Sequence, residues 1–107
     1  MQSITTTGNI ASSGRAKGRV RLLHSIKDAD KINKGDIVVA QNAAPAHIAA
    51  LKNAAGFITE KGGVLSPLAS EARRLRIPCL VGARDAMGIL KDGDIVEMNN
   101  GEIKILS

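Results

Sequence analysis

The residues best suited to bind a ligand lie between positions 56 and 67. The apolar run Gly56–Thr59 predicts a short buried strand, and it leads into the Gly62–Gly63 pair. Ser66 and Pro67 follow, in the order typical of the N-cap and first residue of a helix. Such a strand, loop and helix start presents free N–H groups and the positive end of a helix dipole. The stretch therefore predicts an anion site, with phosphate as the first candidate. Glycines that serve only positive φ angles or tight packing remain the alternative.

Three side chains have the chemistry to accept a phosphoryl group, namely Ser66, His24 and His47. A serine hydroxyl needs a neighbouring base, and the sequence identifies none, which favours a capping role for Ser66. His24 ends a predicted strand and His47 lies beside the apolar stripe of a predicted helix, so we interpret both as surface or boundary residues. Cys79 lies in an apolar run and is expected to be an inert buried thiol. With one cysteine and no CxxC spacing, we expect neither a metal site nor a cofactor.

The elements that must position the loop alternate along the chain. Apolar periodicity predicts strands over residues 14–22, 37–40, 56–59, 77–82, 95–98 and 102–106, and helices from Pro45 and Pro67. Ser25 is expected to cap a short helical turn, and residues 83–90 to form a weak helix or loop. In the first helix, Ile48 and Leu51 set an apolar stripe that Ala44 and Ala55 extend. In the strand 14–22, the small residues Ala16 and Gly18 predict close approach by another piece of backbone.

These elements predict an α/β fold around a mixed sheet, with a hairpin at each end of the chain. A length of 107 residues with 44% hydrophobic content suits one domain, residues 1–107. The expected core consists of Ile37 to Val39, Phe57, Ile58, Leu68, Ala72, Leu75, Leu80, Val81, Ile95 and Ile103.

The net charge of +5, from 15 Lys and Arg against 10 Asp and Glu, is compatible with an anionic partner. One Phe, no Tyr and no Trp argue against nucleic acid, since single-strand readers stack bases on aromatic rings. The strand 14–22 gathers Arg15, Lys17, Arg19 and Arg21 on one face, interpreted as a solvated sheet face with an acidic docking partner as the alternative. The sequence has no signal-peptide pattern and no apolar stretch that could span a bilayer. We expect a cytoplasmic protein without a membrane partner.

The block that follows the glycine loop is the most specific motif. Gly62, Gly63 and Ser66 are followed by Ala69, Ala72, Arg73, Ile77, Pro78 and Gly82. It resembles the mobile phosphohistidine domain of phosphoenolpyruvate-utilising enzymes, which reads Gly-Gly-x-Thr-Ser-His-x-Ala-Ile-x-Ala-Arg-Glu and then Gly-Ile-Pro-x-Val-x-Gly. The likeness spans nearly the whole chain. It implies a single-domain swivelling β/β/α fold that carries a phosphoryl group on the motif histidine, between an ATP-binding or partner-protein site and a phosphoenolpyruvate/pyruvate barrel.

The sequence departs from the family pattern at the residue that carries the chemistry. Pro67 stands where the family has the phosphorylated histidine, and proline has neither a nucleophile nor an N–H. Leu65, Ser70 and Arg74 replace the usual Thr, Ile and Glu. The resemblance places Thr59 and Arg73 near the phosphoryl group. We therefore expect no catalytic residue, but a weak phosphate or anion site made by Thr59, Gly62, Gly63, Ser66 and Arg73.

The expected function follows from that loss. We expect a stand-alone mobile-domain homologue that acts as a non-catalytic binding or regulatory module, a pseudoenzyme with a protein partner. The partner would be a phosphotransferase subunit or a regulated enzyme. The alternative is a subunit of a split phosphoenolpyruvate/pyruvate-type phosphotransferase that works with nucleotide-binding and barrel partners.

Overall fold

A single curved sheet organises the chain. The computed structural model describes residues 2–4, 8–42, 45–49 and 51–107. Eight strands in this described part have the order β1-β8-β7-β3-β4-β5-β6-β2. The strands are β1 (Gln2–Ile4), β2 (Asn9–Ser12), β3 (Arg15–Leu23), β4 (Ile37–Ala40), β5 (Gly56–Thr59), β6 (Cys79–Val81), β7 (Ile95–Asn99) and β8 (Glu102–Ile105). The helices are α1 (Pro45–Ala49), α2 (Pro67–Leu75) and α3 (Ala86–Ile89), with 3₁₀ turns η1 (Ile26–Lys31) and η2 (Leu51–Asn53).

Strand β3 joins two kinds of sheet. Its first half pairs antiparallel with β7, from Arg15 opposite Asn99 to Arg19 opposite Ile95. Its second half pairs parallel with β4, beginning with Val20 opposite Ile37. In the antiparallel half, one face of the strand is exposed to solvent, which explains why charged and small residues alternate over positions 15–19. Arg15, Lys17 and Arg19 are the exposed residues. The predicted close approach is also confirmed, because a Cβ on Gly18 would collide with the carbonyl oxygen of Gly35.

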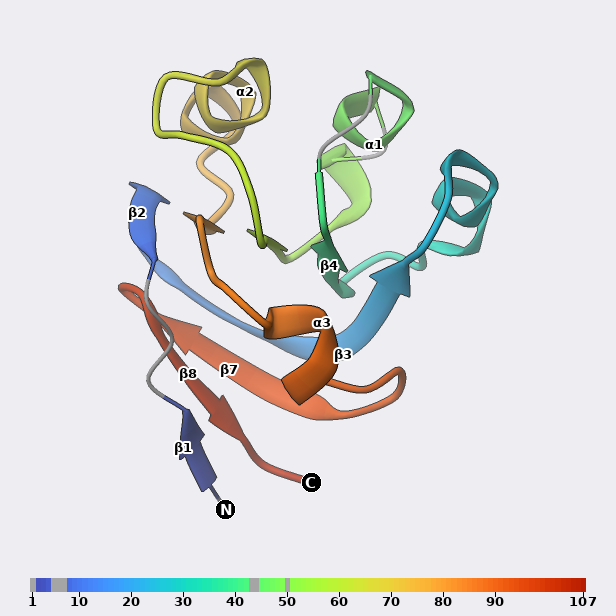
Figure 1. The fold of residues 1–107 in the computed structure, drawn as a ribbon, viewed down its shortest axis with the longest axis vertical. Helices are drawn as coiled ribbons and strands as arrows, with labels where there is room; N and C mark the ends of the chain where they lie inside the picture. Colours follow the sequence, from blue (N-terminus) through green and yellow to red (C-terminus); the bar gives the residue numbers. More distant parts are fainter. Residues whose placement is uncertain (1, 5–7, 43–44, 50) are drawn as a thin grey trace.

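The core has two parts, one on each face of the parallel strands. Helices α1 and α2 cover one face of β4, β5 and β6, while α3 and the β7–β8 hairpin lie on the other (Figure 1). Alternate residues of β4 serve both sides: Val38 and Ala40 pack under the helices, and Ile37 and Val39 face the hairpin. Because β4 is buried on both faces, its sequence is an uninterrupted apolar run with no polar positions. The predicted α/β fold with a mixed sheet and β/β/α layers is confirmed.

Three expectations about the elements are wrong. The described strands form no N-terminal hairpin: β1 pairs with β8 and β2 with β6, so the first two strands lie at opposite ends of the sheet. Ala55 does not extend the helical stripe: it follows η2 and packs on the hairpin side of the sheet. Leu75 and Ile95 are only partly buried, whereas the other expected core residues are fully buried. Ala44 lies outside the described residues.

Candidate functional site

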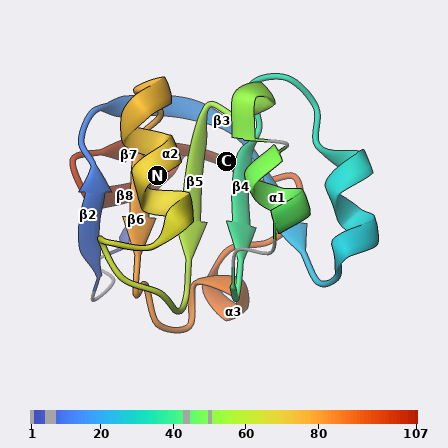
Figure 2. The ribbon, with the colours of Figure 1, turned by 90° about the horizontal axis from the view of Figure 1, so that it is seen from above.

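Strands β3, β4, β5 and β6 run parallel, so their carboxyl ends meet at one edge of the sheet (Figure 2). Polar residues or glycines follow these ends: His24 after β3, Gln41 and Asn42 after β4, Lys61 and Gly62 after β5. Ligands of open α/β sheets bind beyond the carboxyl ends of parallel strands. This edge is therefore the place in the fold where a ligand site is expected.

A cavity of about 460 Å³ opens at this edge and is called here the loop cavity. Its lining residues come from the ends of β4 and β5, from α1 and from the start of α2: Asn42, Pro45, Ile48, Thr59, Lys61, Gly62, Ser66, Pro67 and Leu68. The structure thus brings together three of the predicted site residues, Thr59, Gly62 and Ser66, with Pro67 beside them. Gly63 lies in the same loop and is exposed, but it does not line the cavity.

The start of α2 has the predicted capping geometry. Ser66 is the N-cap, with φ −67° and ψ 160°, and its Oγ accepts a hydrogen bond of 3.2 Å from the N–H of Ala69. The Ser66 hydroxyl proton is still able to donate. Gly62 has a φ of 108°, a conformation that favours glycine. Within the described residues, the N–H groups of Gly62 and Leu68 have no hydrogen-bond partner. The cavity is thus lined by residues that offer several donors to an anion.

Thr59 is the least expected member of this set. The residue is 1% exposed, and its Oγ1 has no hydrogen-bond partner in the structure. A Cβ added to Gly62 would lie 3.9 Å from that oxygen, so the hydroxyl faces the glycine loop across a short gap. A buried hydroxyl without a partner is destabilising, and buried polar groups of native proteins rarely go unpaired. Thr59 therefore leaves one buried hydroxyl unsatisfied in the wall of the loop cavity.

Arg73 lies elsewhere. Its Nη1 donates to the carbonyl oxygens of Ala11 in β2, at 3.0 Å, and of Val64 in the glycine loop, at 2.7 Å, while Nη2 donates to Ser70 Oγ at 3.3 Å. With Arg76 and residues 10–13 it lines a separate groove of about 560 Å³. The side chain does fold back toward the start of α2, as helical side chains favour. Arg73 thus binds the carbonyl of Val64 in the glycine loop, but it does not line the loop cavity.

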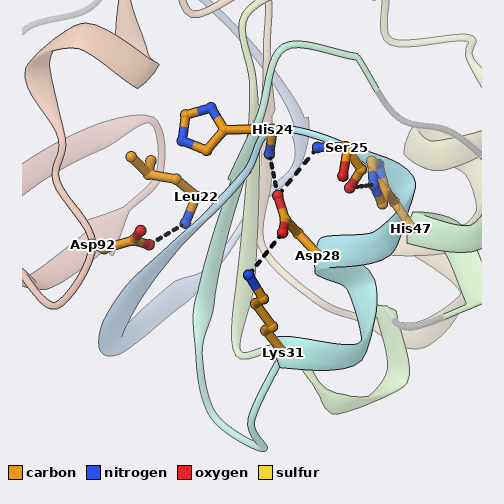
Figure 3. A network of polar contacts seen from close by, with 7 residues as sticks. All are labelled: Leu22, His24, Ser25, Asp28, Lys31, His47 and Asp92. Carbon is orange, nitrogen blue, oxygen red and sulfur yellow. Dashed lines mark hydrogen bonds and ion pairs between the residues drawn. The ribbon is translucent and has the colours of Figure 1, made fainter.

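The two histidines lie at the neighbouring strand end. His24 and His47 both line a smaller cavity of about 170 Å³ that shares Asn42 with the loop cavity. His47 is 5% exposed, and its Nε2 lies 3.5 Å from the Ser25 carbonyl oxygen. The imidazole of His24 points away from that of His47 (Figure 3). The structure thus places both rings next to the candidate site, but outside it.

The carboxylate between the two histidines has a structural role. Asp28 accepts hydrogen bonds from the N–H groups of His24, at 2.8 Å, and Ser25, at 3.2 Å, and pairs with Lys31 at 3.2 Å (Figure 3). These contacts, the His24 N–H first, lower the pKa of Asp28 below its ordinary value. Asp28 therefore stays ionised and fixes the turn from β3 into η1.

Other chemistry is sparse in the part of the chain that the structure describes. No group of three or more His, Cys, Asp or Glu residues there could hold a metal ion. Cys79 is buried as expected, and burial raises the pKa of its thiol to about 12. Glu60 points to the opposite face, where its carboxylate accepts from the N–H of Met87 in α3 at 2.9 Å. No described helix is long and apolar enough to cross a membrane.

Sequence reasoning missed several residues of the loop cavity, namely Asn42, Pro45, Ile48, Lys61 and Leu68. Asn42 and Lys61 had a usable signal, because each follows a predicted buried strand and parallel strands end at one edge. Pro45, Ile48 and Leu68 had none, since their apolar periodicity only indicates a helix face toward the core.

The fold, the glycine loop and the start of α2 are those expected of the family that the sequence motif resembles. The family described as PEP-utilising enzyme, mobile domain, matches residues 32–102, so this chain belongs to that family. A probable phosphoenolpyruvate synthase from Methanothermobacter thermautotrophicus is 40% identical over 98 residues, which are 92% of this chain and 14% of that protein. The uncharacterized phosphotransferase YvkC of Bacillus subtilis is 34% identical over 102 residues, 94% of this chain and 12% of that protein. The chain thus spans about one seventh of the length of these relatives, or less.

Two solved structures resemble the fold. An NMR structure of the Enzyme I protein nEIt has a TM-score of 0.62 and 29% identity, over 73% of this chain and 33% of that chain. Aconitase X from Thermococcus kodakaraensis has a TM-score of 0.74 over the full length of both chains, at 20% identity. At that identity the second likeness concerns the fold alone.

Proposed function

We propose that this chain is a mobile-domain homologue that does not carry a phosphoryl group and instead acts as a binding or regulatory module. The observation that supports the proposal is the position of Pro67, the first residue of α2 and part of the loop cavity wall. In the family motif that the sequence resembles, this is the position at which the phosphorylated histidine is expected. The proline ring has no nucleophile, and its nitrogen lacks the N–H that other residues would offer to an anion.

The hydroxyl groups of the loop cavity do not replace the missing imidazole. Ser66 and Thr59 would need a base to become nucleophiles, but no His, Asp or Glu is among the described residues that line the cavity. What remains is a set of donors around a helix N-terminus. We propose that Thr59, Gly62, Gly63 and Ser66 form a residual phosphate or anion site, and that Arg73 supports it through the Val64 carbonyl.

A phosphate titration followed by NMR tests the residual site. We expect millimolar affinity, about −4 kcal/mol, because a few hydrogen bonds to a hydrated anion gain little over water. The amides of residues 62–66 and of Leu68 should shift, with sodium chloride at equal ionic strength as the control. Shifts that instead cluster on residues 15–21 would reject the loop site and identify the basic face of β3 as the binding surface.

The substitution Pro67→His tests why transfer is absent. If the pocket geometry is retained, the variant should acquire acid-labile phosphate from a donor complex that phosphorylates a family member, and the parent chain should not. An inert variant beside a phosphorylated family member would show that the loop itself no longer supports transfer. Phosphate on the parent chain would reject the non-catalytic proposal outright.

A second function is supported by the relatives. The matched phosphoenolpyruvate synthase of Methanothermobacter thermautotrophicus is a much longer protein, of which this chain corresponds to 14%. In this alternative, the chain is one subunit of a split phosphotransferase, with nucleotide-binding and barrel partners. Incubation with such partners and either ATP or phosphoenolpyruvate distinguishes the two functions. Acid-labile phosphate on this chain would favour the alternative and direct attention to His24 or His47.

The setting of the protein is part of the proposal. We take residues 1–107 as one domain unit and a phosphotransferase subunit or a regulated enzyme as its protein partner. A cytoplasmic location agrees with a lone cysteine that is buried and unpaired. Isolation of the proteins that co-purify with the chain tests the partner, and recovery of none would contradict a binding role.

A further inference from the structure

The loop cavity has two chemically different sides. Hydrogen-bond donors come from Asn42, Thr59, Lys61, Gly62 and Ser66, whereas Pro45, Ile48, Pro67 and Leu68 contribute apolar surface. A phosphate dianion in this open cavity gives up water where it faces the apolar residues and receives no hydrogen bonds from them. A ligand with a small charged end and an apolar body suits both sides.

We infer that the loop cavity binds an amphipathic carboxylate, that is, a carboxylate joined to a compact apolar group. The carboxylate would accept hydrogen bonds from the N–H groups of Gly62 and Leu68 and from the hydroxyls of Thr59 and Ser66. The apolar group would pack on Ile48 and Pro67. This inference rests on the anion site of the proposed function and names the class of its ligand.

Two independent observations point to a ligand at this place. The helix that begins at Ser66 has nine residues, long enough for a dipole at its N-terminus. The Thr59 hydroxyl is 1% exposed, lines the same cavity and has no partner. A carboxylate oxygen at the loop would give this hydroxyl the acceptor it lacks.

The size of the cavity also favours an organic ligand over a bare anion. Its volume of about 460 Å³ lies within the range of roughly 300 to 1,000 Å³ that is usual for small-molecule sites. Such sites are mostly apolar, with few polar groups that fix orientation. The single cation in the lining, Lys61, suits one negative charge.

A ligand series on the 107-residue chain, followed by NMR, tests the inference. The probes are acetate, 4-methylpentanoate, the uncharged 4-methylpentan-1-ol and inorganic phosphate. Each buried CH₂ group strengthens binding about fourfold, so half-burial of four extra carbons predicts roughly fifteenfold tighter binding of 4-methylpentanoate than of acetate. The alcohol should leave the amides of residues 62–66 unmoved. Equal binding of acetate and 4-methylpentanoate would overturn the inference.

Failure of the inference is distinguishable from failure of the proposed function. If phosphate and acetate shift the loop amides and 4-methylpentanoate binds no tighter, the anion site stands and only the amphipathic ligand is rejected. If no anion shifts these amides, both are rejected. N-acetyl-leucine separates two sources of the same chemistry: tight binding indicates the C-terminus of a protein, and tight binding of 4-methylpentanoate alone indicates a free acid.

Variants assign the two ends of the ligand. Ile48→Thr should weaken 4-methylpentanoate several-fold and leave acetate unchanged, whereas Ile89→Thr, an exposed apolar site outside the cavity, should change neither. Thr59→Val keeps the side-chain shape, removes one donor and should weaken both carboxylates. Equal effects of Ile48→Thr and Ile89→Thr would overturn the apolar contact. If Ile48→Thr does not fold, the ligand series decides alone.

Discussion

The guanidinium of Arg73 connects three parts of the fold, and its removal should cost more stability than its exposed position suggests. Nη1 donates to Ala11, whose carbonyl lies at the irregularity where the register of β2 on β6 shifts. It also donates to Val64, in the loop before α2. Hydrogen bonds from a charged group contribute about 1.5–3 kcal/mol each when buried. Discounted for solvent on the outer side, the two together contribute about 2 kcal/mol.

The substitution Arg73→Ala should therefore lower the free energy of unfolding by about 2 kcal/mol. With a urea m-value of roughly 1.3 kcal/mol/M for a chain of this size, the midpoint should fall by about 1.5 M. The loop should loosen at the same time, so the NMR signals of residues 62–65 should shift and their amides exchange faster with solvent. Chemical denaturation and hydrogen exchange measure the two effects.

The neighbouring arginine provides a matched control. Arg74 is exposed, and its guanidinium pairs with Glu71 on its own helix, so Arg74→Ala should leave the urea midpoint nearly unchanged. A midpoint for Arg73→Ala equal to that of Arg74→Ala would refute the reasoning, because it would mean that the bonds to Ala11 and Val64 add nothing in solution. A lower midpoint with unmoved loop signals would refute the link to the loop.

Three further outcomes are expected. Arg76 is the C-cap of α2 and has a φ of 58°, a conformation that glycine adopts without strain. Arg76→Gly should therefore raise the free energy of unfolding in urea by about 0.5–1 kcal/mol. A lower free energy of unfolding would show that a contact of Arg76 outweighs the strain. Burial raises the pKa of Cys79 to about 12, so iodoacetamide at pH 8 should alkylate it only as fast as the chain opens; rapid labelling of the native chain would contradict this. The pKa of Asp28 is lowered from 3.8, so its contribution is complete above that pH and is lost as the pH falls below it. Asp28→Asn should therefore flatten the fall of unfolding free energy below pH 3.8, and an unchanged acid limb would exclude Asp28 as its cause.

The sequence predicted elements well where one physical cause dominates the pattern. Val38 and its neighbours are buried on both faces, so they leave an uninterrupted apolar run, and β4 was predicted to the residue. Strand β2 leaves no such signal, because it has one partner strand and a register shift between Ile10 and Ser12. Its pairing with β6 joins residues about 70 positions apart in the sequence, which local periodicity does not encode.

The candidate site shows the same limit. Loop and helix start could be predicted from the order of Gly62, Ser66 and Pro67, because capping is local chemistry. The contact of Arg73 with Ala11 could not, since the two residues are 62 positions apart in the sequence. The apolar wall formed by Ile48 was equally hidden, because a helix face toward a cavity and one toward the core have the same period.

Pro67 explains how the chemistry of the motif can be lost while its structure is kept. At the first position of α2, the N–H of any residue would have no partner within the helix, and the fixed φ of proline already suits the helix. Ser66 still caps the helix through Ala69, so the geometry does not depend on the side chain at 67. Under the proposed function, replacement of a phosphoryl acceptor at this position would therefore remove transfer with little effect on the fold. The apolar ring of Pro67 in the cavity wall also agrees with the proposed apolar part of the ligand.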